Sequence, residues 1–176
     1  MSVPNLLSLS RTLMAAGMYW SVANSEWYIA VSILWVAIFT DVMDGYLARK
    51  QQTSSPIGGL FDHGSDAVFV TVTIAAHLHH DWAPVLLVFM IPAAFLQYML
   101  DSHTLAGQPL RASSLGKYNG ISYFVFAGFP IMQLTLGMTL IPFDWFIWFG
   151  WGLVLTTAIS MLDRLITLLS QQNSDN

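Results

Sequence analysis

Four carboxylates lie in one short stretch of the sequence, between Asp41 and Asp66, and could together bind divalent cations. Asp41 and Asp44 are three residues apart, and Asp62 and Asp66 are four apart. On a helix, either spacing places both side chains on one face. These are four of the ten acidic residues of the chain, and they lie at or inside the ends of two strongly apolar segments. Because a carboxylate at membrane depth is costly unless it has a partner, the acids indicate a functional site.

Divalent cations are the partners that suit four clustered carboxylates. Negative charges this close would otherwise repel one another or take up protons. All-oxygen ligation favours Mg²⁺ or Mn²⁺ over zinc, and two such ions roughly 3.5–4 Å apart can clamp a phosphoryl group. We therefore expect a site for Mg²⁺ or Mn²⁺, with two ions, formed by Asp41, Asp44, Asp62 and Asp66.

Small residues and one arginine accompany these acids. Gly45 and Ala48 follow Asp41 by one and two helical turns, and they leave room for a bulky ligand on that face. Gly58 lies at the start of the next apolar segment, where the N-terminal amides of a helix favour anions. Arg49 offers a fork of donors that fits a phosphate or a carboxylate. Acids for metal, glycines for access and a cation for phosphate together favour a pyrophosphate site.

The composition favours lipid as the solvent for much of the chain. Of the 176 residues 55% are hydrophobic and only 9% are charged, whereas a soluble domain has roughly 25% charged residues. The net charge of -4 and the lack of a basic stripe argue against nucleic acid as a partner. The absence of cysteine excludes disulfides and thiolate chemistry. We expect an all-α integral membrane protein with a single domain over residues 1–176.

Six apolar stretches are each near the roughly 20 residues that a helix needs to cross a bilayer. They are Asn5–Ala23, Glu26–Ala48, Gly59–His77, Trp82–Leu100, Asn119–Ile141 and Trp145–Leu169. Pro92 and Pro130 fall inside two of them, where proline kinks a transmembrane helix rather than ending it. We therefore predict six transmembrane helices, followed by a disordered tail at residues 171–176.

The basic residues predict the orientation of these helices. The loops after the second and fourth stretches carry Arg49, Lys50, Arg111 and Lys117, whereas the opposite loops carry Glu26, Asp81 and Asp144. By the positive-inside rule both termini face the cytoplasm, as does the stretch that holds the four aspartates.

The complete pattern around the acids is D-x2-D-G-x2-A-R-x8-G-x3-D-x3-D. It resembles the signature of the CDP-alcohol phosphotransferases, also called CDP-alcohol phosphatidyltransferases, at all eight positions. Two further runs, Pro4–Arg11 and Ser114–Lys117, are similar to flanking motifs of the phosphatidylglycerophosphate and cardiolipin synthase branch. The chain thus looks nearest in its flanking motifs to phosphatidylglycerophosphate synthase.

The resemblance implies a six-helix membrane enzyme, commonly a homodimer, that moves a substituted phosphate from a CDP-linked donor to an alcohol and releases CMP. It implies that Asp41, Asp44 and Asp62 hold the metal ions. It also implies that Asp66 is the general base, with a share in metal binding. A bacterial inner (cytoplasmic) membrane is the expected location, with the active site facing the cytoplasm.

The resemblance also implies where the substrates bind. The CDP donor, expected to be CDP-diacylglycerol, would meet Asp41, Gly45, Ala48, Arg49 and Gly58. The leading acceptor is glycerol 3-phosphate. Its phosphate could be bound by Arg111 and Lys117, which could equally be positive-inside anchors.

Other acceptors stay open, because two segments depart from the glycerophosphate enzymes. Asp62–Asp66 reads D-H-G-S-D, as in the choline and ethanolamine branch, and Tyr98–Asp101 replaces an Arg-Glu pair. Inositol phosphate, serine, phosphatidylglycerol and choline- or ethanolamine-type alcohols are the alternatives. From another class, a divalent-cation transporter would also need acids in a helical bundle, but it would place them near the bilayer midplane.

Three other groups are expected to have supporting roles. His63 follows Asp62 directly, so its sequence position directs it off the face of the acids and favours indirect support. Arg164 is expected to form a local charge pair with Asp163. Ordinary interfacial positions are expected for His77, His79 and His80.

Overall fold

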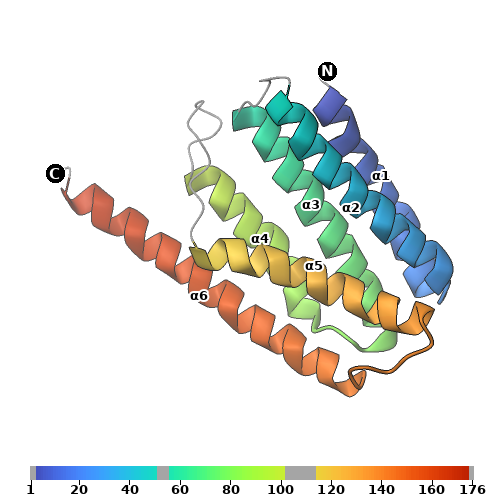
Figure 1. The fold of residues 1–176 in the computed structure, drawn as a ribbon. Coiled ribbons are helices and arrows are strands. Elements are labelled where there is room, and N and C mark those ends of the chain that lie inside the picture. Colours follow the sequence, from blue (N-terminus) through green and yellow to red (C-terminus); the bar gives the residue numbers. More distant parts are fainter. Residues whose placement is uncertain (1–2, 51–55, 102–113, 175–176) are drawn as a thin grey trace.

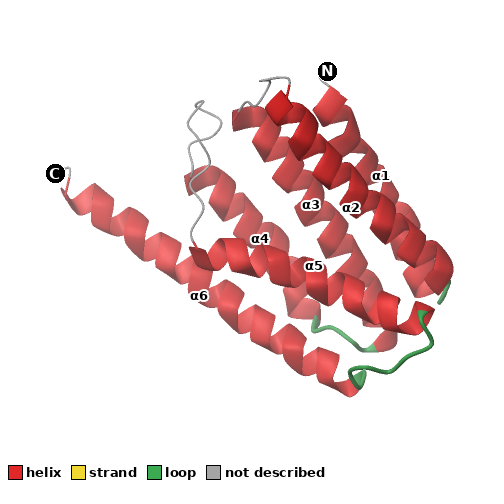
Figure 2. Ribbon diagram, viewed as in Figure 1, coloured by secondary structure: helices red, strands yellow, loops and turns green. Residues whose placement is uncertain are grey.

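The computed structural model describes residues 3–50, 56–101 and 114–174, and within this part the chain forms helices joined by short loops (Figure 2). The described part contains six α-helices and one short 3-10 helix. They are α1 (Val3–Ala23), α2 (Trp27–Lys50), α3 (Pro56–His77), η1 (Leu78–His80), α4 (Val85–Asp101), α5 (Ser114–Thr135) and α6 (Asp144–Ser174). Each apolar stretch of the sequence therefore corresponds to one α-helix.

The end predicted for the fifth stretch, at Ile141, was wrong, because α5 ends at Thr135. Gly137 adopts a left-handed conformation with φ 64°. The N–H of Met138 donates to the carbonyl of Gln133 at 2.9 Å, and the N–H of Gly137 donates to that of Leu134 at 3.1 Å. These two bonds form a Schellman cap, which turns the chain away from the helix although the following residues are apolar.

The last helix continues further than the apolar pattern. α6 runs to Ser174, so residues 171–174, which we expected in a disordered tail, are helical. Neither proline nor glycine interrupts this segment, and Gln171 and Gln172 have good helix propensity. The helix thus extends beyond the point at which its side chains cease to be apolar.

The helices form a ring in which each has two or more neighbours. α1 packs against α2 and α3; α3 also packs against α4 and α5; α6 packs against α4 and α5; and α2 packs against α5. The start of α1, the end of α2 and the start of α3 lie at the same end of the bundle (Figure 1). The fold therefore brings the two segments of the aspartate pattern, and the N-terminal helix, to one place.

Two groups of buried apolar side chains hold this ring together. One joins α1, α2, α3 and α5 and includes Met18, Leu34 and Phe69. The other joins α3, α4, α5 and α6 and includes Leu87 and Phe126. Both α3 and α5 contribute to both groups. Since α3 also packs against α1, α4 and α5, it is a rigid support for the acids on it.

A close approach fixes α6 against the segment before α4. A Cβ placed on Gly150 would overlap Cδ of Pro84, while one on Gly152 would meet open space. Gly150 is buried and Gly152 is exposed. The lack of a side chain at Gly150 thus allows the backbone of α6 to reach Pro84.

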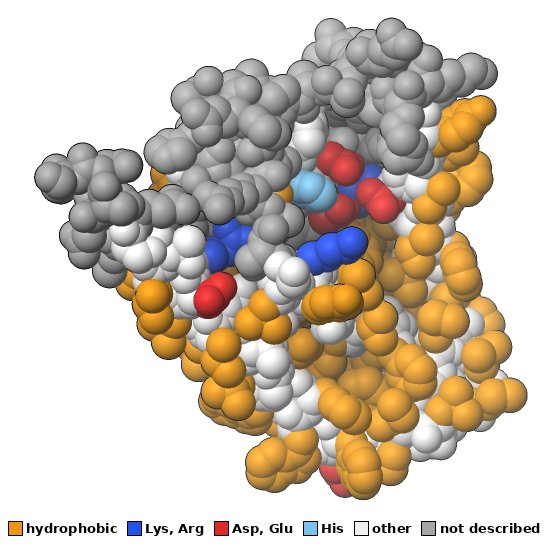
Figure 3. Space-filling view, turned by 60° about the vertical axis from the view of Figure 1, so that its left-hand side comes forward, with side chains coloured by type: hydrophobic (Ala, Val, Ile, Leu, Met, Phe, Trp, Pro, Cys, Tyr) orange, Lys and Arg blue, Asp and Glu red, His pale blue; other side chains and the backbone are white. Residues whose placement is uncertain are grey.

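The outer surface of the bundle is largely apolar. Exposed side chains include Tyr28 at 77%, Trp148 at 74% and Leu13 at 70%, and hydrophobic side chains are spread over the lower, described part of the face in Figure 3. Among the described residues, Asp144–Thr167 is the one helix long and apolar enough to cross a membrane, and two shorter apolar helices are Trp27–Met43 and Val85–Leu100. Six membrane spans and their orientation stay predictions.

Candidate active site

Arg11 lies at the centre of three aspartates from the sequence pattern. Its Nη2 is 3.2 Å from Oδ1 of Asp41, and its Nη1 is 3.3 Å from Oδ1 of Asp62. Nη1 also contacts Oδ1 of Asp66. The arginine is 0% exposed. One buried cation from α1 is therefore surrounded by carboxylates from α2 and α3.

Local geometry on α3 explains why these groups meet. Asp62 and Asp66 lie one helical turn apart, so they share one face of α3, and Arg11 of α1 contacts both of them on that face. Buried Ser65 lies between them, donates from Oγ to the carbonyl of Asp62 at 2.8 Å and accepts from Arg11 Nη1 at 3.3 Å. The structure thus brings together three of the four predicted metal ligands.

The carboxylates lie between the buried arginine and an open space. The exposed fraction of the side chain is 45% for Asp41, 32% for Asp62 and 21% for Asp66. An ionised carboxylate has two oxygens and about four lone-pair sites, so a contact of Arg11 with one oxygen does not use up its capacity. Each of the three carboxylates therefore keeps an oxygen with free lone pairs that a cation could approach from the exposed side.

His63 lies closer to the acids than its sequence position suggested. One ligand atom from each of Asp62, His63 and Asp66 lies within 4.8 Å of the others. The imidazole also meets the ring of Tyr98, with centroids 6.2 Å apart. Two carboxylates and an imidazole form a ligand group that suits several divalent metals, so His63 joins the candidate ligands.

Other predicted site residues fall partly outside the described structure. Asp44, Gly45, Ala48 and Arg49 belong to α2, but their side chains are not among the described ones, and Arg111 lies outside the described residues. Gly58 lies in the first turn of α3, one turn before Asp62. The roles assigned to these residues stay predictions.

Asp41 and Asp66 open onto a cleft of about 550 Å³, lined by residues from α2, α3, α4, α5 and α6. Asp41, His63 and Asp66 line one side, and Lys117 and Arg164 also line it. Figure 3 shows acidic, basic and histidine side chains gathered around a hollow in the surface. The cleft thus combines sites for cations with positive charges that could meet an anion.

Arg164 and Arg11 are two candidates that the sequence reasoning did not assign to the site. Arg164 has its Cζ 4.9 Å from the centroid of the Tyr98 ring, a cation–π distance that holds the guanidinium at the cleft. In the sequence, Arg164 is a basic residue near the end of the last apolar stretch, which the positive-inside rule places on the same side as Lys117. The signal for Arg11 is a charge within the first apolar stretch, where charges usually have a function.

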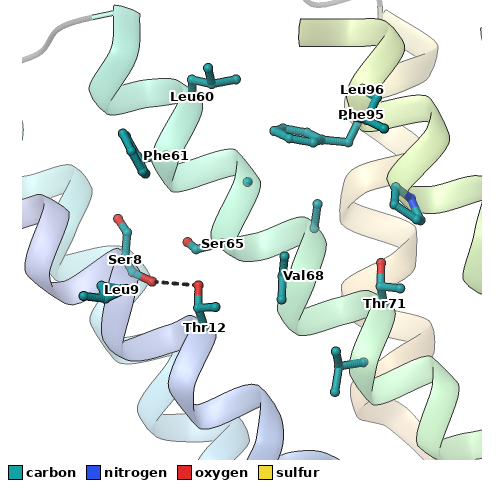
Figure 4. Close-up of a pocket in the computed structure, with 14 residues that line it drawn as sticks. Ser8, Leu9, Thr12, Leu60, Phe61, Ser65, Val68, Thr71, Phe95 and Leu96 are labelled. Atoms are coloured by element: carbon teal, nitrogen blue, oxygen red, sulfur yellow. Dashed lines mark hydrogen bonds between the residues drawn. The ribbon is translucent and has the colours of Figure 1, made fainter.

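A second cavity, of about 630 Å³, lies between α1, α3 and α4 and is lined mainly by apolar side chains (Figure 4). Leu9, Phe61, Val68 and Phe95 contribute to its wall. Ser65, which accepts a hydrogen bond from Arg11, also lines it. An apolar space therefore adjoins the acidic site.

Comparisons with known proteins are consistent with this arrangement. A cardiolipin synthase (CMP-forming) from Rattus norvegicus is 29% identical over 91 residues, which is 51% of this chain and 30% of the relative. The chloroplastic CDP-diacylglycerol–glycerol-3-phosphate 3-phosphatidyltransferase 1 of Oryza sativa subsp. japonica is 33% identical over 129 residues, 71% of this chain and 37% of the relative. A CDP-diacylglycerol–glycerol-3-phosphate 3-phosphatidyltransferase from Pseudomonas fluorescens is 32% identical over 77 residues, 42% of this chain and 40% of the relative.

These matches span well under two thirds of each of those relatives. The similarity to the family as a whole extends further along this chain, because the family profile described as CDP-alcohol phosphatidyltransferase matches residues 1–163. That range includes α1, with Arg11, and both segments of the aspartate pattern. On this match, which covers most of its length, the chain belongs to the CDP-alcohol phosphatidyltransferase family.

Proposed function

We propose that this protein transfers a phosphatidyl group from CDP-diacylglycerol to an alcohol and releases CMP. The observation that carries the proposal is the convergence of Asp41, Asp62 and Asp66 on Arg11, with Asp41 and Asp66 lining a cleft that also holds Lys117 and Arg164. Membership of the family supports the same reaction. A pyrophosphate donor requires carboxylates that bind its metal ions, and a phosphate-bearing acceptor requires cationic side chains that bind its phosphate.

The acids divide into two roles. Asp41, Asp44 and Asp62 hold two Mg²⁺ or Mn²⁺ ions, and Asp66 serves as general base with a share in their ligation. Bound divalent ions would neutralise the pyrophosphate and the departing CMP. Asp66 is the least exposed of the three described acids, so it suits a base that must work away from bulk water.

The chemical step is an in-line displacement. The acceptor oxygen forms a bond to the phosphorus that carries the diacylglycerol, while the bond from that phosphorus to the bridging oxygen of CMP breaks. Asp66 takes the proton of the acceptor hydroxyl, which is a poor nucleophile without a positioned base. Arg49, Gly45, Ala48 and Gly58 are proposed to hold the CDP part.

The acceptor is proposed to be glycerol 3-phosphate, as the names of several relatives suggest. Lys117 and Arg164 line the cleft beside the acids, and they would bind its phosphate by charge-assisted hydrogen bonds. Arg111 stays a further proposed contact. The neighbouring apolar cavity beside Ser65 would take an acyl chain of the donor.

The setting of the reaction is proposed to be a bacterial inner membrane. The apolar exterior and the long apolar helix in α6 support membrane embedding. We propose six spans, both termini on the cytoplasmic side, an active site that faces the cytoplasm, and a homodimer.

The reaction can be tested with purified protein, CDP-diacylglycerol, Mg²⁺ or Mn²⁺ and a panel of alcohols, by following CMP release and the lipid product. We expect release with glycerol 3-phosphate above all, and we expect little release from Asp66→Asn. No CMP with any acceptor would refute the proposed reaction. Efficient release with another alcohol would keep the reaction and change the acceptor.

A further inference from the structure

Arg11 has a position that the proposed reaction does not explain. Its guanidinium is fully buried, and it contacts carboxylates of the expected metal site on two other helices. A buried guanidinium is strongly unfavourable without anionic partners, and clustered carboxylates are unfavourable without a cation. The arginine and the acids therefore stabilise one another in the absence of any other ion.

We propose that Arg11 is a positioning residue that serves as the built-in cation of the acidic site. It holds Asp41, Asp62 and Asp66 together before divalent ions bind, and it competes with those ions once they do. The inference rests on the metal site of the proposed function, and it assigns to Arg11 no contact with donor or acceptor.

The geometry supports both halves of the inference. The planar guanidinium presents several donors in a fixed fork, so one side chain reaches all three acids, and Ser65 also contacts it at 3.3 Å. These contacts use Oδ1 of each carboxylate, and carboxylate oxygens are the atoms that Mg²⁺ or Mn²⁺ would bind. The arginine and the ions thus need the same atoms.

The charges give the direction of the effect. Asp41, Asp62 and Asp66 carry a net charge of −2 together with the guanidinium of Arg11, and a net charge of −3 without it. Without the arginine, the same three carboxylates attract cations more strongly. Even at the permittivity of water, a unit positive charge about 6 Å from a divalent ion weakens its binding about tenfold.

Arg11→Gln should therefore be less stable than the wild type in EDTA but should bind Mn²⁺ more tightly. In EDTA, the variant should unfold several degrees below the wild type, because its acids have lost their cation. In titrations with Mn²⁺ alone, followed by the electron paramagnetic resonance of free Mn²⁺, its dissociation constant should fall about tenfold. Added Mn²⁺ should raise its unfolding temperature more than that of the wild type.

Met18→Ala provides the matched control. Met18 is fully buried on α1, two turns after Arg11 on the same face, and it touches apolar side chains rather than the acids. This variant should unfold at a lower temperature both in EDTA and in Mn²⁺, with a Mn²⁺ dissociation constant equal to that of the wild type. Loss of packing in α1 is thereby separated from loss of the cation.

Arg11→Lys keeps the inference testable if Arg11→Gln does not fold. It retains the charge but loses the fork, so it should fall between the wild type and Arg11→Gln in both measurements. An unchanged or weaker Mn²⁺ affinity in Arg11→Gln would overturn the inference, as would a weaker affinity in Arg11→Lys. No binding of Mn²⁺ by the wild type would instead contradict the metal site of the proposed function.

Discussion

Replacing Arg164 by Gln should weaken the binding of a phosphate-bearing acceptor while leaving the binding of the donor unchanged. Arg164 lines the same cleft as Asp41 and Asp66, and the ring of Tyr98 lies 4.9 Å from its Cζ. The arginine is therefore held at the mouth of the site rather than free to leave it. Its proposed partner is the phosphate of glycerol 3-phosphate.

The size of the effect follows from the exposure of the side chain. A hydrogen bond to a charged group contributes about 1.5–3 kcal/mol. Because Arg164 is only partly buried, the lower end applies, and about 1.5 kcal/mol corresponds to roughly a tenfold rise in KM for the acceptor. Lys117 is exposed, so Lys117→Gln should have a smaller effect.

The assay measures the initial rate of CMP release while the concentrations of glycerol 3-phosphate and CDP-diacylglycerol are varied separately. Arg164→Lys retains the charge and loses the bidentate fork, so its KM for the acceptor should lie between those of the wild type and Arg164→Gln. An unchanged KM for the acceptor would refute the proposed role of Arg164. An equal rise in KM for both substrates would point to a general disturbance of the cleft and would also refute it.

Three further predictions concern the base, the ions and the packing of α6. Asp66→Asn should lower single-turnover CMP release by about 10²–10⁴-fold, the usual contribution of a general base, and a wild-type rate would exclude that role. EDTA should stop CMP release, and Mg²⁺ or Mn²⁺ should restore it; undiminished turnover in EDTA would contradict a metal requirement. Gly150→Ala should lower the free energy of unfolding by about 1–3 kcal/mol, through overpacking against Pro84, and so lower the unfolding temperature. Gly152→Ala, with open space around it, should leave the temperature equal or higher, and equal losses in both variants would argue against the close approach.

The acids were the part of the site that local spacing could predict. Asp62 and Asp66 share a face because they are one turn apart on a helix. Asp41 lies at the same end of the bundle (Figure 1) and meets them through Arg11, because α1 packs against both α2 and α3. Arg11 and Arg164 could not be found in this way. Their contacts with the site depend on how α1 packs against α3 and how α6 packs against α4, which no local pattern determines.

The helices themselves followed from the apolar stretches, whereas some of their ends did not. Hydropathy continues to Ile141, but the left-handed conformation of Gly137 ends α5 earlier. In the other direction, α6 continues into polar residues up to Ser174. Hydropathy reports which solvent a segment prefers, and the backbone hydrogen bonds decide where its helix ends.

The pairing of Arg11 also bears on how the chain is assembled during synthesis. Its partners Asp62 and Asp66 follow 51 and 55 residues later, so they do not yet exist when α1 leaves the ribosome. In the proposed membrane setting, Arg11 with Asp41 alone of its three carboxylate partners would still be costly, and α1 would therefore reach its final depth only after α3 has been made. The first three helices would then enter the membrane as one cooperative unit, with the acidic site completed in the same event.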